Sequence, residues 1–265
     1  MPKFNDFDMQ NWKSLGDIET DSLWIIEKRD NSGKNDGFYH GNFVPQIPRQ
    51  LIKRYTKAGD VVLDPFAGSG TTVYEAETLA RNCIAIDLKS DMVSYVRQKM
   101  ADTLSENFFE IFQADSADGS MPDKVRAVLA KHNRKQVQLV ILHPPYFDIV
   151  KFSDNPNDLS NAKSLFKFLE QFGKVVENAV NVLEKGRYLA IVIGDKYSAG
   201  QWYPLGFYCM QEAMRQGLTL KSVIVKNMDG NRGKKNQNSI WRYRALTSDY
   251  YIFKHEYIFL LKKAG

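Results

Sequence analysis

The residues best suited to chemistry follow an apolar run in the middle of the 265-residue chain. The segment VQLVIL (137–142) leads directly into His143, Pro144, Pro145 and Tyr146. Two consecutive prolines have no backbone N–H and restrict φ, so the carbonyl groups beside them are held in a preset direction. A neutral imidazole adds one nitrogen acceptor, and the aromatic ring adds a flat face for stacking. The pattern therefore indicates hydrogen-bond acceptors and a stacking surface at the end of a buried strand.

A second candidate site is the glycine-rich segment after the run VVLDPF (61–66). It reads Asp64-Pro65-Phe66-Ala67-Gly68-Ser69-Gly70-Thr71-Thr72, and a helix-like stretch follows. Glycines permit a tight turn and close backbone approach to a ligand, and a helix N-terminus offers free N–H groups. Asp87 ends the next apolar run, where it can accept hydrogen bonds from ribose hydroxyls or cap the next helix. Val73 stands where the dinucleotide fingerprint has its third glycine, which argues against NAD.

Both segments require a framework, and the sequence predicts a doubly wound α/β sheet. Seven runs rich in β-branched and aromatic residues are the expected strands, and helix-like stretches separate the first six. The runs are 61–66, 83–88, 108–115, 137–142, 188–195, 220–227 and 257–262. Residues 159–186 predict the longest helix, with Gly186 as its stop. Because residues 227–257 lack a helical pattern, we expect the last strand to return antiparallel to the sixth.

Composition favours a single globular domain. Hydrophobic residues make up 43% of the chain and charged residues 25%, which is ordinary for a globular protein. We expect an N-terminal arm (1–44) on one domain (45–265), with no membrane span and no metal site. The two cysteines, Cys83 and Cys209, suggest reduced thiols in a cytoplasmic protein. The net charge of +5 makes nucleic acid a plausible partner.

DPFAGSGTT followed by HPPY resembles the two motifs of the DNA amino-methyltransferases, the adenine-N6 and cytosine-N4 family. Residues 38–60 are similar to the helix before that family's cofactor loop, and HEYIFLLKK (255–263) to its closing strand. The resemblance implies a Rossmann-like methyltransferase fold: a seven-stranded, mostly parallel sheet with the last strand antiparallel and helices on both faces. It also implies methyl transfer from S-adenosylmethionine to the amino group of a flipped DNA base, with adenine N6 slightly preferred over cytosine N4. An RNA substrate and a catalytically inactive nucleic-acid-binding subunit are the alternatives.

The same resemblance assigns roles to individual residues. Those that would bind the cofactor are Asp64, Pro65, Phe66, Gly68, Gly70, Thr71, Thr72, Asp87 and Asp115. Those that would be catalytic are His143, Pro144, Pro145 and Tyr146. Asp87 would hold the ribose; Asp115 would hold the adenine amino group, although a turn or cap role is equally open. His143 departs from the family's Asp, Asn or Ser, and only its neutral form can accept a hydrogen bond.

A basic segment within the expected insert 226–256 is the candidate nucleic-acid contact. Its basic and aromatic residues are Lys226, Arg232, Lys234, Lys235, Trp241, Arg242 and Arg244. Basic side chains contact phosphates, and polar neighbours can contact base edges; a solvated charged surface is the alternative. Recognition then rests with this insert, with a second copy in a homodimer, or with a companion recognition or restriction subunit.

Overall fold

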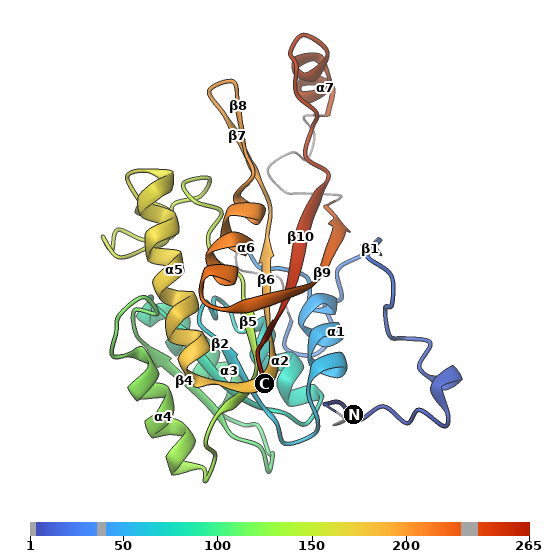
Figure 1. Ribbon diagram of the computed structural model, residues 1–265, viewed down its shortest axis with the longest axis vertical. Coiled ribbons are helices and arrows are strands. Elements are labelled where there is room, and N and C mark those ends of the chain that lie inside the picture. The colour runs from blue at the N-terminus through green and yellow to red at the C-terminus, as the bar shows by residue number, and fades with distance from the viewer. Residues whose placement is uncertain (1–3, 36–40, 229–237) are drawn as a thin grey trace.

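The computed structural model describes residues 4–35, 41–228 and 238–265, which form an α/β fold around one large sheet (Figure 1). The sheet has eight strands in the order β1-β9-β10-β6-β5-β2-β3-β4. They are β1 (Leu23–Trp24), β2 (Val61–Asp64), β3 (Asn82–Asp87), β4 (Phe109–Gln113), β5 (Val137–Leu142), β6 (Leu183–Ile193), β9 (Leu218–Asn227) and β10 (His255–Lys263). Each of the seven predicted strands is present, and β1 adds an eighth at the edge.

The sheet is mostly parallel, as predicted. β2 pairs in parallel with both β3 and β5, and β5 with β6. The last strand, β10, lies between β6 and β9 and is antiparallel to both. A β-hairpin of β7 (Lys196–Ser198) and β8 (Gln201–Tyr203) extends from the end of β6.

Helices cover both faces of the sheet (Figure 1). They are α1 (Gln46–Tyr55), α2 (Thr71–Thr78), α3 (Ser90–Met100), α4 (Met121–Lys131), α5 (Leu165–Val182) and α6 (Leu205–Arg215). The first three pack in one buried cluster and the last three in another. Successive residues of β2 alternate between these clusters: Val61 and Leu63 belong to one and Val62 to the other. The strands are therefore buried on both sides, which explains their continuous apolar character.

Two predicted element boundaries are wrong. The helix expected over residues 159–186 is shorter: α5 begins after Ser164, which accepts a hydrogen bond from the N–H of Lys167, and ends at Val182. β6 begins at once because Leu183 pairs with Val137 of β5, and Gly186 lies inside this strand at φ +76° rather than ending a helix. The segment expected to be irregular contains α7 (Asn238–Leu246).

The described part of the N-terminal arm lies against the domain. Trp24 is buried, and the carbonyl of Ser22 accepts a hydrogen bond from the N–H of Val225 at 2.8 Å. Asn35 donates to Glu75 of α2 at 2.9 Å. Cys83 and Cys209 are buried free thiols. Within the described ranges, no helix combines the length and the apolar character that crossing a bilayer requires.

Candidate active site

The sheet brings the two sequence motifs to the same edge. β2 and β5 are parallel neighbours, so their carboxyl ends lie side by side. The glycine-rich loop follows β2, and His143 follows β5. Asp87 is the last residue of β3, on the other side of β2. Ligands of open α/β sheets bind at this edge, outside the carboxyl ends of the strands.

The glycine-rich loop is a tight turn that only glycine can complete. The N–H of Gly70 donates to the carbonyl of Ala67 at 2.8 Å, and Gly70 has φ +88°. A Cβ at Gly70 would lie 2.8 Å from Cγ1 of Val96. Helix α2 begins at the next residue, Thr71, so its N-terminus faces the same edge of the sheet. The N–H groups of Ala67, Gly68 and Gly70 are used within the protein, so the first turn of α2 is the part that can offer backbone N–H groups to a ligand at this edge.

Asp87 connects the loop to the sheet. One carboxylate oxygen accepts a hydrogen bond from the N–H of Gly68 at 2.7 Å, and the other accepts from the N–H of Lys89 at 2.9 Å. Burial raises the pKa of Asp87 to about 6. The bond to Lys89 is a local turn before α3, whose N-cap is Lys89 and not Asp87, so the helix-cap alternative is wrong. The ribose role stays a prediction.

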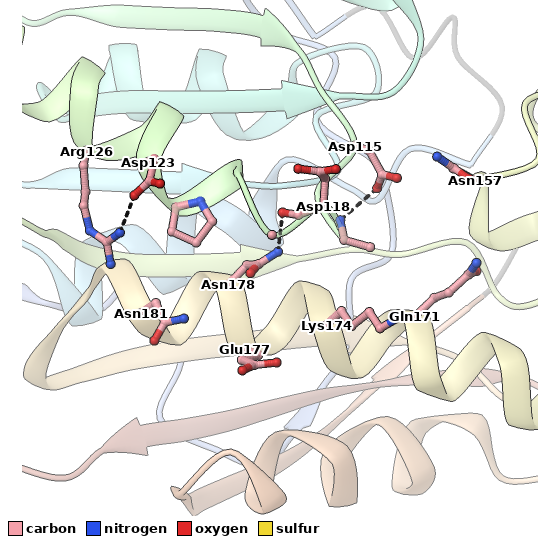
Figure 2. A pocket seen from close by; sticks show the side chains of 13 residues that line it. Asp115, Asp118, Asp123, Arg126, Asn157, Gln171, Lys174, Glu177, Asn178 and Asn181 are labelled. Carbon is pink, nitrogen blue, oxygen red and sulfur yellow. Dashed lines mark hydrogen bonds and ion pairs between the residues drawn. The ribbon is translucent and has the colours of Figure 1, made fainter.

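Asp115 lies two residues after β4 and makes a local turn. Its Oδ1 accepts from the N–H of Ala117 at 2.8 Å. It also lies at one end of a cavity of about 730 Å³ between α4 and α5, with Asn157 nearby and Arg126 at the far end (Figure 2). The turn role is present; the adenine role stays a prediction.

His143 is half-buried among aromatic side chains. Its ring lies 4.6 Å from the ring of Phe43, between centroids, and edge-on to Tyr146 at 5.8 Å. Burial lowers the pKa of His143 to about 4. The imidazole is therefore neutral at neutral pH and has one nitrogen available as an acceptor. Phe43 was not expected from the sequence at this site, because a lone phenylalanine in a loop carries no positional signal.

Tyr146 is fixed from behind by residues of other strands. Its hydroxyl donates to Oε2 of Glu256 at 2.7 Å. Its ring packs on Gly194, where a Cβ would lie only 2.9 Å from Cε2 of the tyrosine. Burial raises the pKa of Tyr146 well above its usual range. The tyrosine ring is thus held in one orientation at the end of β5.

Lys226 does not lie on the surface, where it was expected to contact nucleic acid. Its ammonium group lies 3.1 Å from Oε1 of Glu256, and both side chains are only 7% exposed. Opposite charges that face each other on adjacent strands neutralise each other, which allows both side chains to be buried. The pair lies behind Tyr146, whose hydroxyl contacts Glu256. The sequence did offer one signal for Glu256: a charged residue inside an apolar strand needs a partner.

The chain turns sharply after the tetrapeptide. Phe147 has φ +55°, an uncommon conformation for a residue with a large side chain. Its ring packs 5.6 Å from Phe168 of α5, and the ammonium of Lys196 lies 4.7 Å above it. Lys196 also pairs with Asp148. These contacts from α5 and β7 hold the strained turn and so the orientation of the residues before it.

Comparison of the sequence with protein families assigns the chain to a known family. The profile of the DNA methylases of the N6/N4 type matches residues 4–98 and 137–265. The chain belongs to the N6/N4 DNA methylase family.

Individual relatives of the chain include methyltransferases of DNA restriction-modification type and one that is named for tRNA. The Type II methyltransferase M.MjaII of Methanocaldococcus jannaschii is 22% identical over 242 residues, 83% of this chain and 44% of the relative. The Type II methyltransferase M.MjaI of the same organism is 36% identical over 91 residues, 34% of this chain and 26% of the relative. A tRNA (guanine(10)-N2)-dimethyltransferase of Methanothermobacter thermautotrophicus is 30% identical over 97 residues, 36% of this chain and 29% of the relative. The match to this chain thus spans less than half of each of these relatives.

Solved structures confirm the Rossmann-like methyltransferase fold. A SAM-dependent methyltransferase from Methanosarcina mazei superposes with a TM-score of 0.53 at 11% identity, covering 81% of this chain and 97% of the other. TrmN from Thermus thermophilus gives 0.50 at 20% identity, covering 83% of this chain and 49% of the other.

The glycine-rich loop fits S-adenosylmethionine, the cofactor of the family. Asp64 is buried, and its Oδ1 accepts from the N–H of Phe66 at 2.9 Å. Its Oδ2 and the hydroxyl of Thr72 are also buried, and the two groups interact with each other, which partly offsets the effect of burial on the pKa of Asp64. Helix α2, which begins at Thr71 in the same loop without a side-chain cap, can offer its first N–H groups to the carboxylate of the methionine part. Burial also raises the pKa of Asp64 to about 6.

Cofactor affinity is expected to fall on mild acidification. Asp64 and Asp87 both have pKa values of about 6, so both are carboxylates above that pH and become protonated below it. A protonated carboxyl loses acceptor capacity for ribose hydroxyls and for the methionine ammonium. Calorimetry with S-adenosylhomocysteine should give a constant Kd above about pH 7 and a rising Kd below about pH 6. An unchanged Kd at about pH 5, with circular dichroism showing a folded protein, would contradict this assignment.

Of the candidate nucleic-acid contacts that the structure describes, Trp241, Arg242 and Arg244 lie together on α7, whereas Lys226 is buried in the sheet. Arg242 and Arg244 are exposed on α7, and the guanidinium of Arg244 lies 5.3 Å from the ring of Trp241. Arg232, Lys234 and Lys235 fall outside the described residues. Figure 1 shows α7 and the β7–β8 hairpin projecting beyond the sheet. Both follow the carboxyl ends of parallel strands, β9 and β6, and so rise from the same edge as His143.

Proposed function

We propose that the protein methylates the exocyclic amino group of a DNA base, with adenine N6 preferred over cytosine N4 and S-adenosylmethionine as the methyl donor. One observation carries the proposal. In a chain of the N6/N4 DNA methylase family, the His-Pro-Pro-Tyr segment ends β5 directly beside the glycine-rich loop that ends β2. The residues suited to hold an amine and the loop suited to hold the methyl donor thus share one edge of the sheet.

The residues of the tetrapeptide would activate the amine. An exocyclic amine is a poor nucleophile because its lone pair is delocalised into the ring. S-adenosylmethionine, when bound, supplies an electrophilic methyl group. Neutral His143 accepts one N–H of the amine, and the carbonyl of Pro144, held by the fixed φ of the prolines, accepts the other. These bonds favour a tetrahedral nitrogen and so are stronger in the transition state than in the ground state.

The target base would leave the double helix to reach this site. Base-modifying enzymes extrude the target nucleotide and hold it by stacking and by hydrogen bonds to its edge. The ring of Tyr146, fixed by Glu256 and Gly194, provides the stacking surface. The hairpin and α7 border the same edge, and stacking of Tyr197 on Tyr250 at 4.4 Å connects the hairpin to the segment after α7. We propose that these projections hold the nucleic acid around the flipped base.

Removing the basic groups of α7 is expected to weaken nucleic-acid binding. The double variant Arg242→Ala/Arg244→Ala should flatten the plot of log affinity against log salt by about 2, since each phosphate contact contributes a slope of about 0.9. Cofactor affinity should not change. Arg215→Ala is the matched control: this arginine is 66% exposed at the end of α6, near the opposite edge of the sheet. If Arg215→Ala weakened nucleic-acid binding as much as the α7 variant does, the arginines of α7 would contribute only to the overall positive charge and would not contact phosphates.

The activity is tested by methyl transfer from labelled S-adenosylmethionine to duplex DNA, single-stranded DNA and RNA, with the methylated base identified by mass spectrometry. We expect N6-methyladenine in DNA. RNA is the second candidate substrate because one relative is a tRNA methyltransferase. Cofactor binding without transfer to any nucleic acid would support an inactive subunit. Because the match spans less than half of its relatives, a companion subunit or a second copy is included as an arm of the assay.

A further inference from the structure

We propose that Glu256 determines, through the hydroxyl of Tyr146, which nitrogen of His143 carries the proton, and that Nδ1 is thereby left as the acceptor. The part concerning the target amine rests on the proposed function; the tautomer itself does not. A carboxylate accepts a hydrogen bond in any orientation, whereas a neutral imidazole accepts at one nitrogen only. A histidine at this position therefore needs a neighbour that sets its tautomer.

The first step is the pairing of Glu256. Glu256 and Lys226 stand directly opposite each other on β10 and β9. Lys226 donates to Oε1 at 3.1 Å, and both residues are buried. A carboxylate held against an ammonium group has no proton to donate. Oε2, which faces Tyr146, is therefore an acceptor.

The second step concerns the single proton of the tyrosine hydroxyl. Tyr146 donates this proton to Oε2 of Glu256 at 2.7 Å. Its oxygen can then only accept further hydrogen bonds. The backbone N–H of Gly194 faces this oxygen, and Nε2 of His143 lies 3.4 Å from it. The remaining lone pair therefore favours a donor at Nε2.

The third step is the tautomer of His143. Burial holds the pKa of His143 near 4, so at neutral pH the ring carries one proton. With that proton on Nε2, Nδ1 is the acceptor. The other neighbours do not compete: the ring of Phe43 offers no hydrogen-bonding atom, and Glu256 and Lys226 act on the imidazole through their charges. Nδ1 has no hydrogen-bond partner among the described residues.

Two substitutions separate the steps. Tyr146→Phe keeps the ring and removes the hydroxyl, so the preference for a proton on Nε2 should disappear. In Glu256→Gln, Lys226 still needs an acceptor, so the amide oxygen should face Lys226 and the amide NH₂ should face Tyr146. The tyrosine would then accept from the amide and donate to Nε2, which should move the imidazole proton to Nδ1.

The ¹⁵N chemical shifts of the histidine rings report the tautomer directly. The chain has four histidines, and the signal of His143 is assigned by its absence in His143→Gln. The wild type should show the Nε2–H form at neutral pH, Tyr146→Phe a mixture, and Glu256→Gln mainly the Nδ1–H form. Glu110→Gln is the matched control, because Glu110 contacts a different histidine, His132, at 2.8 Å. It should alter only the signal of His132.

Kinetics supply a second readout. Single-turnover methylation should fall about 10-fold or more in Glu256→Gln, as is typical when the group orienting a functional imidazole is lost, with unchanged affinity for S-adenosylmethionine. An Nδ1–H tautomer in the wild type, or an unchanged tautomer in both variants, would overturn the proposal. If Glu256→Gln does not fold, Tyr146→Phe, which leaves the buried ion pair intact, decides the question. Because the spectrum needs no methyl transfer, an inactive wild type would overturn the proposed function and leave the tautomer measurable.

Discussion

The variant His143→Ala is expected to slow single-turnover methyl transfer by about 100-fold, the usual cost of removing one hydrogen bond made in the transition state. His143 follows β5, and its ring contacts those of Phe43 and Tyr146. Affinity for S-adenosylmethionine should therefore stay at the wild-type value. Rapid-quench measurement with labelled cofactor and excess enzyme isolates the chemical step from product release.

Restoring an acceptor at position 143 is the control for this variant. His143→Asn and His143→Asp keep an oxygen acceptor and should retain more activity than alanine. They should also lose the pH dependence that an imidazole confers. Methylation at the wild-type rate in His143→Ala would show that the imidazole is not an acceptor for the amine.

The same histidine sets a pH dependence. Because the neutral imidazole is the active form and its pKa is about 4, the wild-type rate at saturating S-adenosylmethionine should be constant around neutrality and fall only towards pH 4. An unperturbed histidine would place this fall near about pH 6.5. The folded-state pKa is below the unfolded-state value, so the unfolded chain takes up the proton first. Stability from His143 is therefore lost as pH falls from about 6.5 to about 4, and thermal melts over this range separate unfolding from loss of activity.

The variant Asp87→Ala is expected to abolish the rise in melting temperature that S-adenosylmethionine produces. A ligand at 100 times its Kd stabilises the native state by about 2.7 kcal/mol, and this gain vanishes with binding. The substitution removes the predicted ribose acceptor and also the acceptor for the N–H groups of Gly68 and Lys89, which shape the loop. Differential scanning fluorimetry with and without cofactor measures both effects.

Asp91→Ala is the matched control for Asp87→Ala. Asp91 lies four residues further along the chain, on α3, with a side chain that is 63% exposed and 3.4 Å from Lys89. Its loss should leave the cofactor-induced shift intact. If S-adenosylmethionine raised the melting temperature of Asp87→Ala as much as that of the wild type, Asp87 would not be a cofactor-binding residue. Loss of this rise in both variants would indicate a general effect of charge.

Local features of the sequence were sufficient for the framework and for the two motifs. Continuous apolar runs predicted the seven strands because strands of a sheet covered on both faces need no polar side. Gly70 marked the loop because its positive φ, here +88°, is a backbone conformation that favours glycine. The position of His143 at the carboxyl edge followed from the strand before it. Each of these properties depends on residues close together in the chain.

Element boundaries followed the sequence less well, because local preference competes there with pairing between distant segments. The helical pattern of residues 159–186 continues past Val182, but Leu183 gains a strand partner in β5 and the helix ends. The basic segment contains α7, whose nine residues were too short and too polar to give a clear periodicity.

Only the tertiary structure decided the surroundings of the tetrapeptide. Tyr146 and Glu256 are 110 residues apart in sequence, and their hydrogen bond exists because β10 inserts between β6 and β9. The same insertion buries Lys226, which the sequence alone had placed among exposed phosphate contacts. Whether a charge faces solvent or a buried partner depends on which strands are neighbours. Strand order is set by the packing of the whole sheet. The short segments that identify a motif therefore do not predict which strands are neighbours.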